Sequence, residues 1–322
     1  MKTLLLRARD VAQACPMEDA IEAVEQGFRA LSTGQATTPV RLSVPINKEG
    51  VALTMPASLT GAPWYSVKVV SVAPANRSIG RPLVTATVLL IDASSGDLVA
   101  LIEGAALTAL RTGAAGGVAA RALSRPDATR VALFGAGAQA RSQLLALVAS
   151  RAIRDVRVVT RDPAHAAAFC GWASGEPRLA GIAIRPAGVS DGLTGADVVV
   201  TATSSAVPVF PGEALPAGVH ITAVGSFTPQ MRELDDAALR GARIIVDQRA
   251  AALAEAGELQ GLRAADVVEL GEVLTGAMPG RTSEGDRTIF KSVGNAIQDL
   301  VVAIRAFERA RAQGIGELIT FP

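Results

Sequence analysis

The chain has 322 residues, a formal net charge of +1 and 49% hydrophobic residues. This length exceeds the roughly 250–300 residues at which single hydrophobic cores stop growing, which indicates two domains. The balanced charge argues against a nucleic-acid or membrane-surface partner. The sequence shows no apolar run near the roughly 20 residues that span a bilayer, and the apolar 4–6 stretch is too short for a signal peptide.

Cysteine and histidine usage also restricts the function. Cys15 and Cys170 stand in no spacing pattern, which is typical of reduced thiols in a cytoplasmic protein. His165 and His220 are too few for a histidine-based metal site, so we expect no metal and a structural role for each. The composition therefore predicts a cytoplasmic enzyme without metal.

The first third of the chain is rich in strand signals. A helix is predicted over 17–33, and strands follow at 39–46, 51–55, 64–72, 84–91 and 98–102. Turn signals at Asn76, at 80–82 and at 94–97 separate these strands. The pattern predicts a mainly antiparallel sheet.

From residue 130 onward the pattern changes to alternating strands and helices. Strands are predicted at 130–135, 155–160, 181–185, 196–202, 219–224 and 242–247, and helices at about 138–151, 163–173 and 228–241. Near-continuous apolar strands indicate a parallel sheet covered on both faces. A long amphipathic helix, from 292 to about 311, is expected to return to the N-terminal domain.

These elements predict an α/β protein, with a Rossmann-type doubly wound parallel sheet inserted into a mainly antiparallel α+β domain. The predicted boundaries are 1–112, completed by 293–322, for a substrate-binding and dimerisation domain, and 113–292 for a NAD(P)-binding domain.

A glycine turn directly after the first parallel strand is the most informative motif. Gly135 allows the tight turn, Gly137 lets a pyrophosphate approach the helix N-terminus, and the small Ala140 lets the helix pack on the strand. The turn follows a strand, opens a helix and precedes a second strand, which is the context that a dinucleotide fingerprint requires.

The end of the second parallel strand bears on which cofactor is used. An acid there binds the ribose 2′-hydroxyl of NAD, whereas an arginine accommodates the 2′-phosphate of NADP. Thr160 offers a hydroxyl and Arg161 a planar cation. Asp162 precedes Pro163 and is expected to cap the next helix. We therefore expect NADPH, with NADH also possible.

Three cations are candidates for binding a substrate. Only four of the 31 basic residues are lysines, so Lys68, which has apolar neighbours on both sides, stands out. Arg41 lies in a strand-like run, and Arg111 lies where the chain leaves the first domain. Burying a charge is costly unless it is paired, so Lys68 requires a partner carboxylate. An internal salt bridge is the structural alternative. We expect the chemistry outside the carboxyl ends of the parallel strands, where the two domains meet.

Several segments resemble the ornithine cyclodeaminase/mu-crystallin family. They are LTALRTGAA (107–115), LFGAGAQAR (133–141), Met55-Pro56, VKVV (67–70), AVGS (223–226) and FKSVG (290–294). The resemblance implies a homodimer in which the N-terminal sheets of two subunits pair. It also implies that Arg41, Lys68 and Arg111 hold the α-carboxylate of a small substrate beside Met55. The cofactor residues that it implies are Thr112, Gly135, Gly137, Ala138, Gln139, Thr160, Arg161, Thr203, Ser226 and Val293.

One position departs from the cyclodeaminases of this family. They carry an aspartate in the turn after the fifth Rossmann strand, where this chain has Phe227, and they tend to offer a glutamate where it has Ser58. Glu233 and Asp235 are expected to be cap or surface groups. An apolar pocket with a carboxylate clamp suits NADPH-dependent reduction of a cyclic ketimine, Δ1-pyrroline-2-carboxylate or Δ1-piperideine-2-carboxylate, to L-proline or L-pipecolate. The alternatives are an ornithine cyclodeaminase, an NAD-dependent alanine dehydrogenase and a crystallin-like ligand-binding protein.

Overall fold

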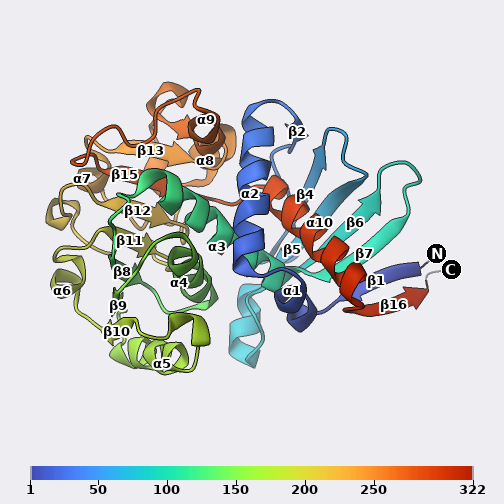
Figure 1. The fold of residues 1–322 in the computed structure, drawn as a ribbon, viewed down its shortest axis with the longest axis horizontal. Helices are drawn as coiled ribbons and strands as arrows, with labels where there is room; N and C mark the ends of the chain where they lie inside the picture. The colour runs from blue at the N-terminus through green and yellow to red at the C-terminus, as the bar shows by residue number, and fades with distance from the viewer. Residues whose placement is uncertain (1, 321–322) are drawn as a thin grey trace. The chain divides into compact units, whose positions relative to one another are not determined.

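The computed structural model describes residues 2–320, which divide into two compact units (Figure 1). The first unit consists of 1–111 and 295–322, and the second of 112–294. Helix α3 (Gly104–Leu123) runs through the boundary between them. Within 2–320, no helix combines the length and the apolar character that crossing a bilayer would require.

The first unit is built on a mainly antiparallel sheet. Its strand order is β16-β1-β7-β6-β5-β4-β2, with β3 paired to β4, and only β1 and β7 run parallel. The strands are β1 (Lys2–Leu6), β2 (Ala36–Thr37), β3 (Leu42–Pro45), β4 (Val51–Leu59), β5 (Trp64–Val72), β6 (Val84–Asp92), β7 (Leu98–Glu103) and β16 (Glu317–Thr320). The terminal strands β1 and β16 pair with each other, so the two chain ends lie side by side.

Three helices belong wholly to this unit: α1 (Ala8–Ala14), α2 (Met17–Ser32) and α10 (Ala296–Gln313). Helix α10 packs against α2 and against strands β4, β5 and β6 (Figure 1). It begins after Asn295, whose side chain accepts a hydrogen bond from the Ile297 amide, and ends at Gly314 in the left-handed conformation. Gly27 lets α2 approach closely, because a Cβ there would lie 3.2 Å from Ile297.

The second unit is a parallel sheet in the order β10-β9-β8-β11-β12-β15-β13-β14. Its strands are β8 (Arg130–Phe134), β9 (Asp155–Val159), β10 (Ala183–Pro186), β11 (Val198–Thr201), β12 (His220–Ala223), β13 (Arg243–Val246), β14 (Val268–Glu269) and β15 (Thr288–Lys291). Alternate residues of one strand enter separate cores: Val131 and Leu133 of β8 pack with one cluster, and Ala132 and Phe134 with another. Both faces of this sheet are therefore buried, as its apolar strands predict.

Helices cover the two faces of this sheet. The α-helices are α4 (Ala138–Ser150), α5 (Pro163–Ser174), α6 (Val189–Leu193), α7 (Asp236–Leu239), α8 (Arg249–Glu255) and α9 (Leu270–Thr275). Short 3-10 turns lie at Pro177–Leu179, Gly212–Ala214, Gly257–Leu259 and Ala264–Asp266 in this unit, and at Pro74–Ile79 in the first. The direction of winding reverses between β8 and β11, because β9 and β10 lie on one side of β8 and β11 and β12 on the other. A sheet of this kind binds ligands at such a switch point.

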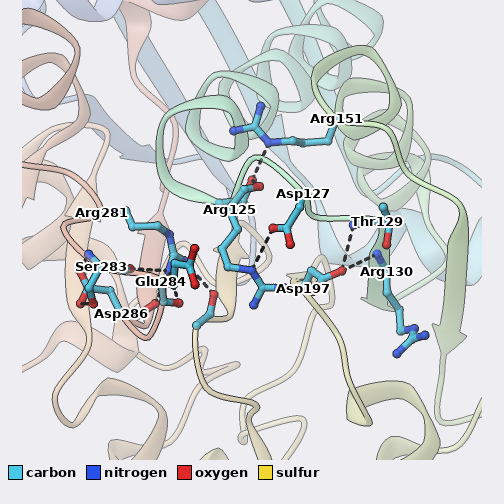
Figure 2. A network of polar contacts seen from close by, with 12 residues as sticks. Arg125, Asp127, Thr129, Arg130, Arg151, Asp197, Arg281, Ser283, Glu284 and Asp286 are labelled. Atoms are coloured by element: carbon cyan, nitrogen blue, oxygen red, sulfur yellow. Dashed lines mark hydrogen bonds and ion pairs between the residues drawn. The ribbon is translucent and has the colours of Figure 1, made fainter.

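Arginines tie the amino edge of this sheet to neighbouring loops (Figure 2). Arg281 donates to the carbonyls of Leu123, at 2.7 Å, and of Gly218, at 2.9 Å. Arg125 pairs with Asp197, whose other oxygen accepts from the backbone of Thr129 and Arg130. This network lies at the edge opposite to the glycine turn, so its role is to hold the scaffold together.

The structure confirms the predicted fold class, but it corrects one helix and adds strands. Only a single turn, α7, forms within the helix predicted over 228–241. The preceding residues stay irregular because the side chain of Glu233 turns inward and binds loop amides. Strands β1, β2, β14, β15 and β16 were not predicted, and β15 lies inside the sheet between β12 and β13.

Candidate active site

Most of the predicted cofactor residues lie at one edge of the second unit's sheet. Each of these residues follows the carboxyl end of a parallel strand. Gly135 and Gly137 follow β8, Thr160 and Arg161 follow β9, Thr203 follows β11, Ser226 follows β12, and Val293 follows β15. Thr112 lies elsewhere, on α3, where its carbonyl accepts a 2.8 Å hydrogen bond from Gln143. The strands thus gather at one edge residues that are up to 158 positions apart, Gly135 to Val293.

The glycine turn after β8 fits a dinucleotide pyrophosphate. Gly135 has φ +111°, and a Cβ there would lie 2.4 Å from the Ala202 carbonyl oxygen, so only glycine is accommodated. A Cβ on Gly137 would meet nothing within 4 Å, and this residue is the N-cap of α4 without a side-chain cap. Ala138 and Gln139 are the first two residues of this helix, and they follow Gly137 directly. An anion can approach the helix N-terminus there without obstruction.

The end of β9 presents one uncommitted cation. Asp162 is the N-cap of α5 and accepts a 2.9 Å hydrogen bond from the Ala164 amide, as its position before Pro163 predicts. The Thr160 hydroxyl donates to the Asp162 carbonyl at 2.7 Å. Arg161 is exposed and forms no ion pair with any residue in 2–320. Its guanidinium therefore remains available to a phosphate.

A buried carboxylate joins the loops that follow β11 and β12. Glu233 is fully buried, and its oxygens accept hydrogen bonds from the Thr201 hydroxyl at 2.8 Å, the Thr203 amide and hydroxyl at 2.7 Å each, and the Gly225 amide at 2.7 Å. The expectation of a cap or surface role for Glu233 is therefore wrong. The same expectation is confirmed for Asp235, the N-cap of α7.

A buried ion pair holds the loop after β12. Lys291 Nζ lies 2.6 Å from both the carbonyl and the hydroxyl of Ser226, and 3.2 Å from the carboxylate of Glu258. The Ser226 hydroxyl in turn donates to Glu258. All three side chains are buried, so the hydroxyl of Ser226 is already bonded and this residue can offer a cofactor only its backbone amide. The next residue, Phe227, is 37% exposed.

The loop after β15 is held by a third buried acid. Asp247 accepts hydrogen bonds from the Ser292 hydroxyl at 2.8 Å and from the amides of Val293 and Gly294 at 3.1 and 2.7 Å. These donors fix the backbone of Val293, the last of the expected cofactor residues.

In the first unit, Lys68 and Arg111 meet on one carboxylate. Lys68 Nζ lies 2.7 Å from Oδ2 of Asp299, and Arg111 Nε lies 3.0 Å from Oδ1. Arg111 Nη1 also donates to Gln298 Oε1 at 2.6 Å. The three charged side chains come from β5, α3 and the first turn of α10. The partner carboxylate that the sequence requires for Lys68 is therefore Asp299.

The environment of Lys68 disfavours its charged form. Its side chain is 2% exposed. Burial, followed by the nearby charge of Arg111, lowers the pKa of Lys68 to about 7, although Asp299 acts in the opposite direction. Arg41, just ahead of β3, lowers this pKa further. The three predicted cations thus act on one another within the first unit.

The remaining predicted pocket residues of the first unit lie on different faces of β4. Met55 is buried and is the register partner of Lys68, so both occupy the same face of the sheet. Ser58, three residues further on, is exposed on the opposite face because side chains alternate along a strand. The structure thus brings Met55 to the cation cluster and leaves Ser58 apart from it.

Asp299 and Gln298 were missed from sequence. Both are fully buried although they lie on an amphipathic helix. The available signal was indirect: a buried lysine and a nearby arginine together require at least one carboxylate, and the final helix was expected to return to this domain.

Comparisons with known proteins show the family of the chain. The model of the ornithine cyclodeaminase/mu-crystallin family matches residues 1–314. A Δ1-pyrroline-2-carboxylate reductase of Bacillus cereus is 37% identical, over 99% of this chain and all of the relative. Among solved structures, the Δ1-pyrroline-2-carboxylate reductase of Thermococcus litoralis with NADH and L-proline is 36% identical, with a TM-score of 0.93 over 98% of this chain and 100% of that one.

An archaeal alanine dehydrogenase dimer with bound NAD is also similar, at 32% identity and a TM-score of 0.93, with both chains fully covered. The fold, the glycine turn and these matches over the whole chain lead to one conclusion. The chain belongs to the ornithine cyclodeaminase/mu-crystallin family.

Proposed function

We propose that this chain is an NAD(P)H-dependent reductase of cyclic ketimine carboxylates. Its substrates are Δ1-pyrroline-2-carboxylate, Δ1-piperideine-2-carboxylate or both, and its products are L-proline and L-pipecolate. The proposal is supported by the similarity to reductases of this class. The observation that carries it in this chain is the buried cation cluster around Lys68.

The cluster carries an excess of positive charge. With Lys68 protonated, Lys68 and Arg111 contribute two positive charges, against one negative charge on Asp299. Arg111 Nη2 donates to no residue in 2–320. Buried charge is stable only when it is compensated, so this arrangement favours an anionic ligand such as a substrate carboxylate.

The loop after β12 favours reduction over deamination. Phe227 occupies the place at which the family's cyclodeaminases carry an aspartate, and a phenyl ring exchanges no proton. Glu233 does not replace that acid, because four hydrogen bonds from Thr201, Thr203 and Gly225 occupy its oxygens. A cyclic imine needs no carboxylate of this kind, since its C=N bond is already formed.

Reduction of the imine requires a hydride at carbon and a proton at nitrogen. A bound nicotinamide supplies the hydride. Lys68 supplies the proton, because a buried amine with a pKa of about 7 is suited to general acid catalysis near neutral pH. Arg111 and Arg41 hold the carboxylate, which fixes the ring relative to Lys68. Positioning of this kind can contribute about 7–11 kcal/mol in good cases.

NADPH is the proposed cofactor, with NADH as a second donor. Arg161 is exposed and uncommitted, whereas one oxygen of Asp162 already accepts a hydrogen bond from the Ala164 amide. A guanidinium at this place accommodates a 2′-phosphate.

The deciding experiment compares substrates side by side. NADPH oxidation is followed with Δ1-pyrroline-2-carboxylate, Δ1-piperideine-2-carboxylate, and pyruvate plus ammonia, and ammonia release is followed with L-ornithine. We expect rapid oxidation with one or both cyclic imines in the absence of ammonia. Turnover only with pyruvate plus ammonia would identify an alanine dehydrogenase instead, and binding of NADPH without any turnover would favour the crystallin-like alternative.

We also propose that the protein is a homodimer that pairs through the sheets of its first units. The run ahead of and along β3 exposes four large apolar side chains: Val40, Leu42, Val44 and Ile46 are 58%, 64%, 47% and 49% exposed. Their spacing of two places them on one face of an extended segment. A row of this kind on a sheet that ends in an open edge is typical of an interface. Light scattering should give twice the mass of the 32.9 kDa chain.

A further inference from the structure

Asp299 occupies an unusual position for a carboxylate. It lies in the first turn of α10, is fully buried, and gives one oxygen to each of two cations. Oδ2 lies 2.7 Å from Lys68 Nζ and Oδ1 lies 3.0 Å from Arg111 Nε. Neither cation has another carboxylate within ion-pair distance in residues 2–320.

No other group around Lys68 can replace this carboxylate. The register partners of Lys68 on β4 and β6 are Met55 and Val88, which are apolar. The remaining charges that act on it are Arg111 on α3 and Arg41 ahead of β3, and both repel a protonated amine. Asp299 is therefore the one group of this cluster that favours the ammonium form of Lys68.

The same carboxylate also fixes how Arg111 is presented. Asp299 takes Nε, and Gln298, its neighbour on α10, takes Nη1 at 2.6 Å. A guanidinium bound at two of its three nitrogens cannot rotate, so the direction of the uncommitted Nη2 is set by α10.

We propose that Asp299 is a positioning residue of the reductase, which keeps Lys68 protonated with one oxygen and orients Arg111 toward the substrate carboxylate with the other. This inference rests on the proposed function. It makes the proton donor and the carboxylate anchor mutually dependent, because both are bound to one side chain.

The test begins with a measurement that needs no turnover. The chain has only four lysines, so ¹³Cε-lysine NMR gives few signals, and Lys68→Met assigns that of Lys68 by its loss. We expect the Lys68 signal of the wild-type protein to titrate near neutral pH. In Asp299→Asn its midpoint should fall by at least one pH unit, and Asp299→Glu should restore part of the shift. A midpoint unchanged in folded Asp299→Asn would overturn the proposal.

Kinetics then separate a positioning role from a structural one. With NADPH and Δ1-pyrroline-2-carboxylate, Asp299→Asn should lower kcat/KM by about 100-fold at pH 8 and move the basic limb of the pH profile to lower pH. The dissociation constant of NADPH should not change. The matched control is Asp10→Asn, which neutralises another buried carboxylate of the first unit, bound to the Arg7 amide, and it should leave the pH profile in place.

The outcomes also distinguish the inference from the proposed function. An inactive wild-type protein whose Lys68 signal still shifts in Asp299→Asn contradicts the reductase assignment alone. An active wild-type protein whose pH profile is the same in Asp299→Asn contradicts the role of Asp299 alone.

Discussion

Replacement of Lys291 by methionine tests whether the ion pair behind Ser226 stabilises the second unit. The change removes an ammonium that lies 2.6 Å from two Ser226 oxygens and 3.2 Å from Glu258. Lys291 and Glu258 have no exposed side-chain surface, so water cannot compensate the carboxylate that remains. Removing one partner of a buried pair costs about 3–5 kcal/mol, and we expect that loss in the free energy of unfolding.

Urea denaturation of Lys291→Met measures this loss, and two variants make the measurement specific. Lys48→Met applies the same substitution to an exposed lysine and should change stability by less than about 0.5 kcal/mol. The double variant Lys291→Met/Glu258→Met removes both charges and should regain most of the loss, because an apolar pair of similar volume replaces the ion pair.

Two results would refute this reasoning. One is a free energy of unfolding of Lys291→Met equal to that of Lys48→Met. The other is a double variant with the same free energy of unfolding as Lys291→Met. The same variants report on the cofactor edge, since Ser226 begins the loop that carries Phe227. We expect the dissociation constant of NADPH to rise in Lys291→Met and to stay unchanged in Lys48→Met.

Three further outcomes are expected. Arg161→Ala should raise the KM for NADPH about 10- to 100-fold and leave that for NADH nearly unchanged, as expected for loss of a charged hydrogen bond; equal losses with both cofactors would contradict the assignment. Burial lowers the pKa of His220 to about 3, below the ordinary 6.5, so unfolded chains bind the proton first and stability falls by about 1.4 kcal/mol per pH unit as the pH decreases below 6.5. The free energy of unfolding, measured by urea denaturation between pH 7 and 5, should show this slope in the wild type and in His165→Gln, a control at an exposed histidine. The slope should be smaller in His220→Gln. The wild-type protein should release no ammonia from L-ornithine, and Phe227→Asp should weaken imine reduction by replacing an apolar ring with a charge; rapid ammonia release would exclude the reductase assignment.

The parallel sheet was predictable because its signals are local. Apolar runs such as 130–134 and 198–201, together with a glycine turn at Gly135, are short patterns that need no distant partner. Strand β16 lacks such a signal, because it is defined by pairing with β1 at the opposite end of the chain. Strand β1 has only a short apolar run, 4–6, and its partners β7 and β16 are distant in the sequence. Strand β15 was overlooked for a related reason: it enters the sheet out of sequence order, between β12 and β13.

The cations of the candidate site were also more accessible to sequence reasoning than its acids. A lysine among apolar residues is conspicuous in an arginine-rich chain, and Lys68 was found in that way. Lys291 follows Ile289 and Phe290 and meets the same criterion. Asp299 does not, because one acid on an amphipathic helix has the pattern of a solvated face. Its burial follows from α2, β4, β5 and β6 all packing against α10, which no helical periodicity reveals.

The buried acids of the two units differ in what they bind, and that difference bears on function. Glu233 and Asp247 accept hydrogen bonds only from hydroxyls and backbone amides, with no cation at ion-pair distance in residues 2–320, so their charge holds loops in place. Asp299 instead binds two cations, Lys68 and Arg111, so this cluster is positive whenever Lys68 is protonated. Uncompensated buried charge is unfavourable. Under the proposed function, the carboxylate of the substrate would compensate that charge.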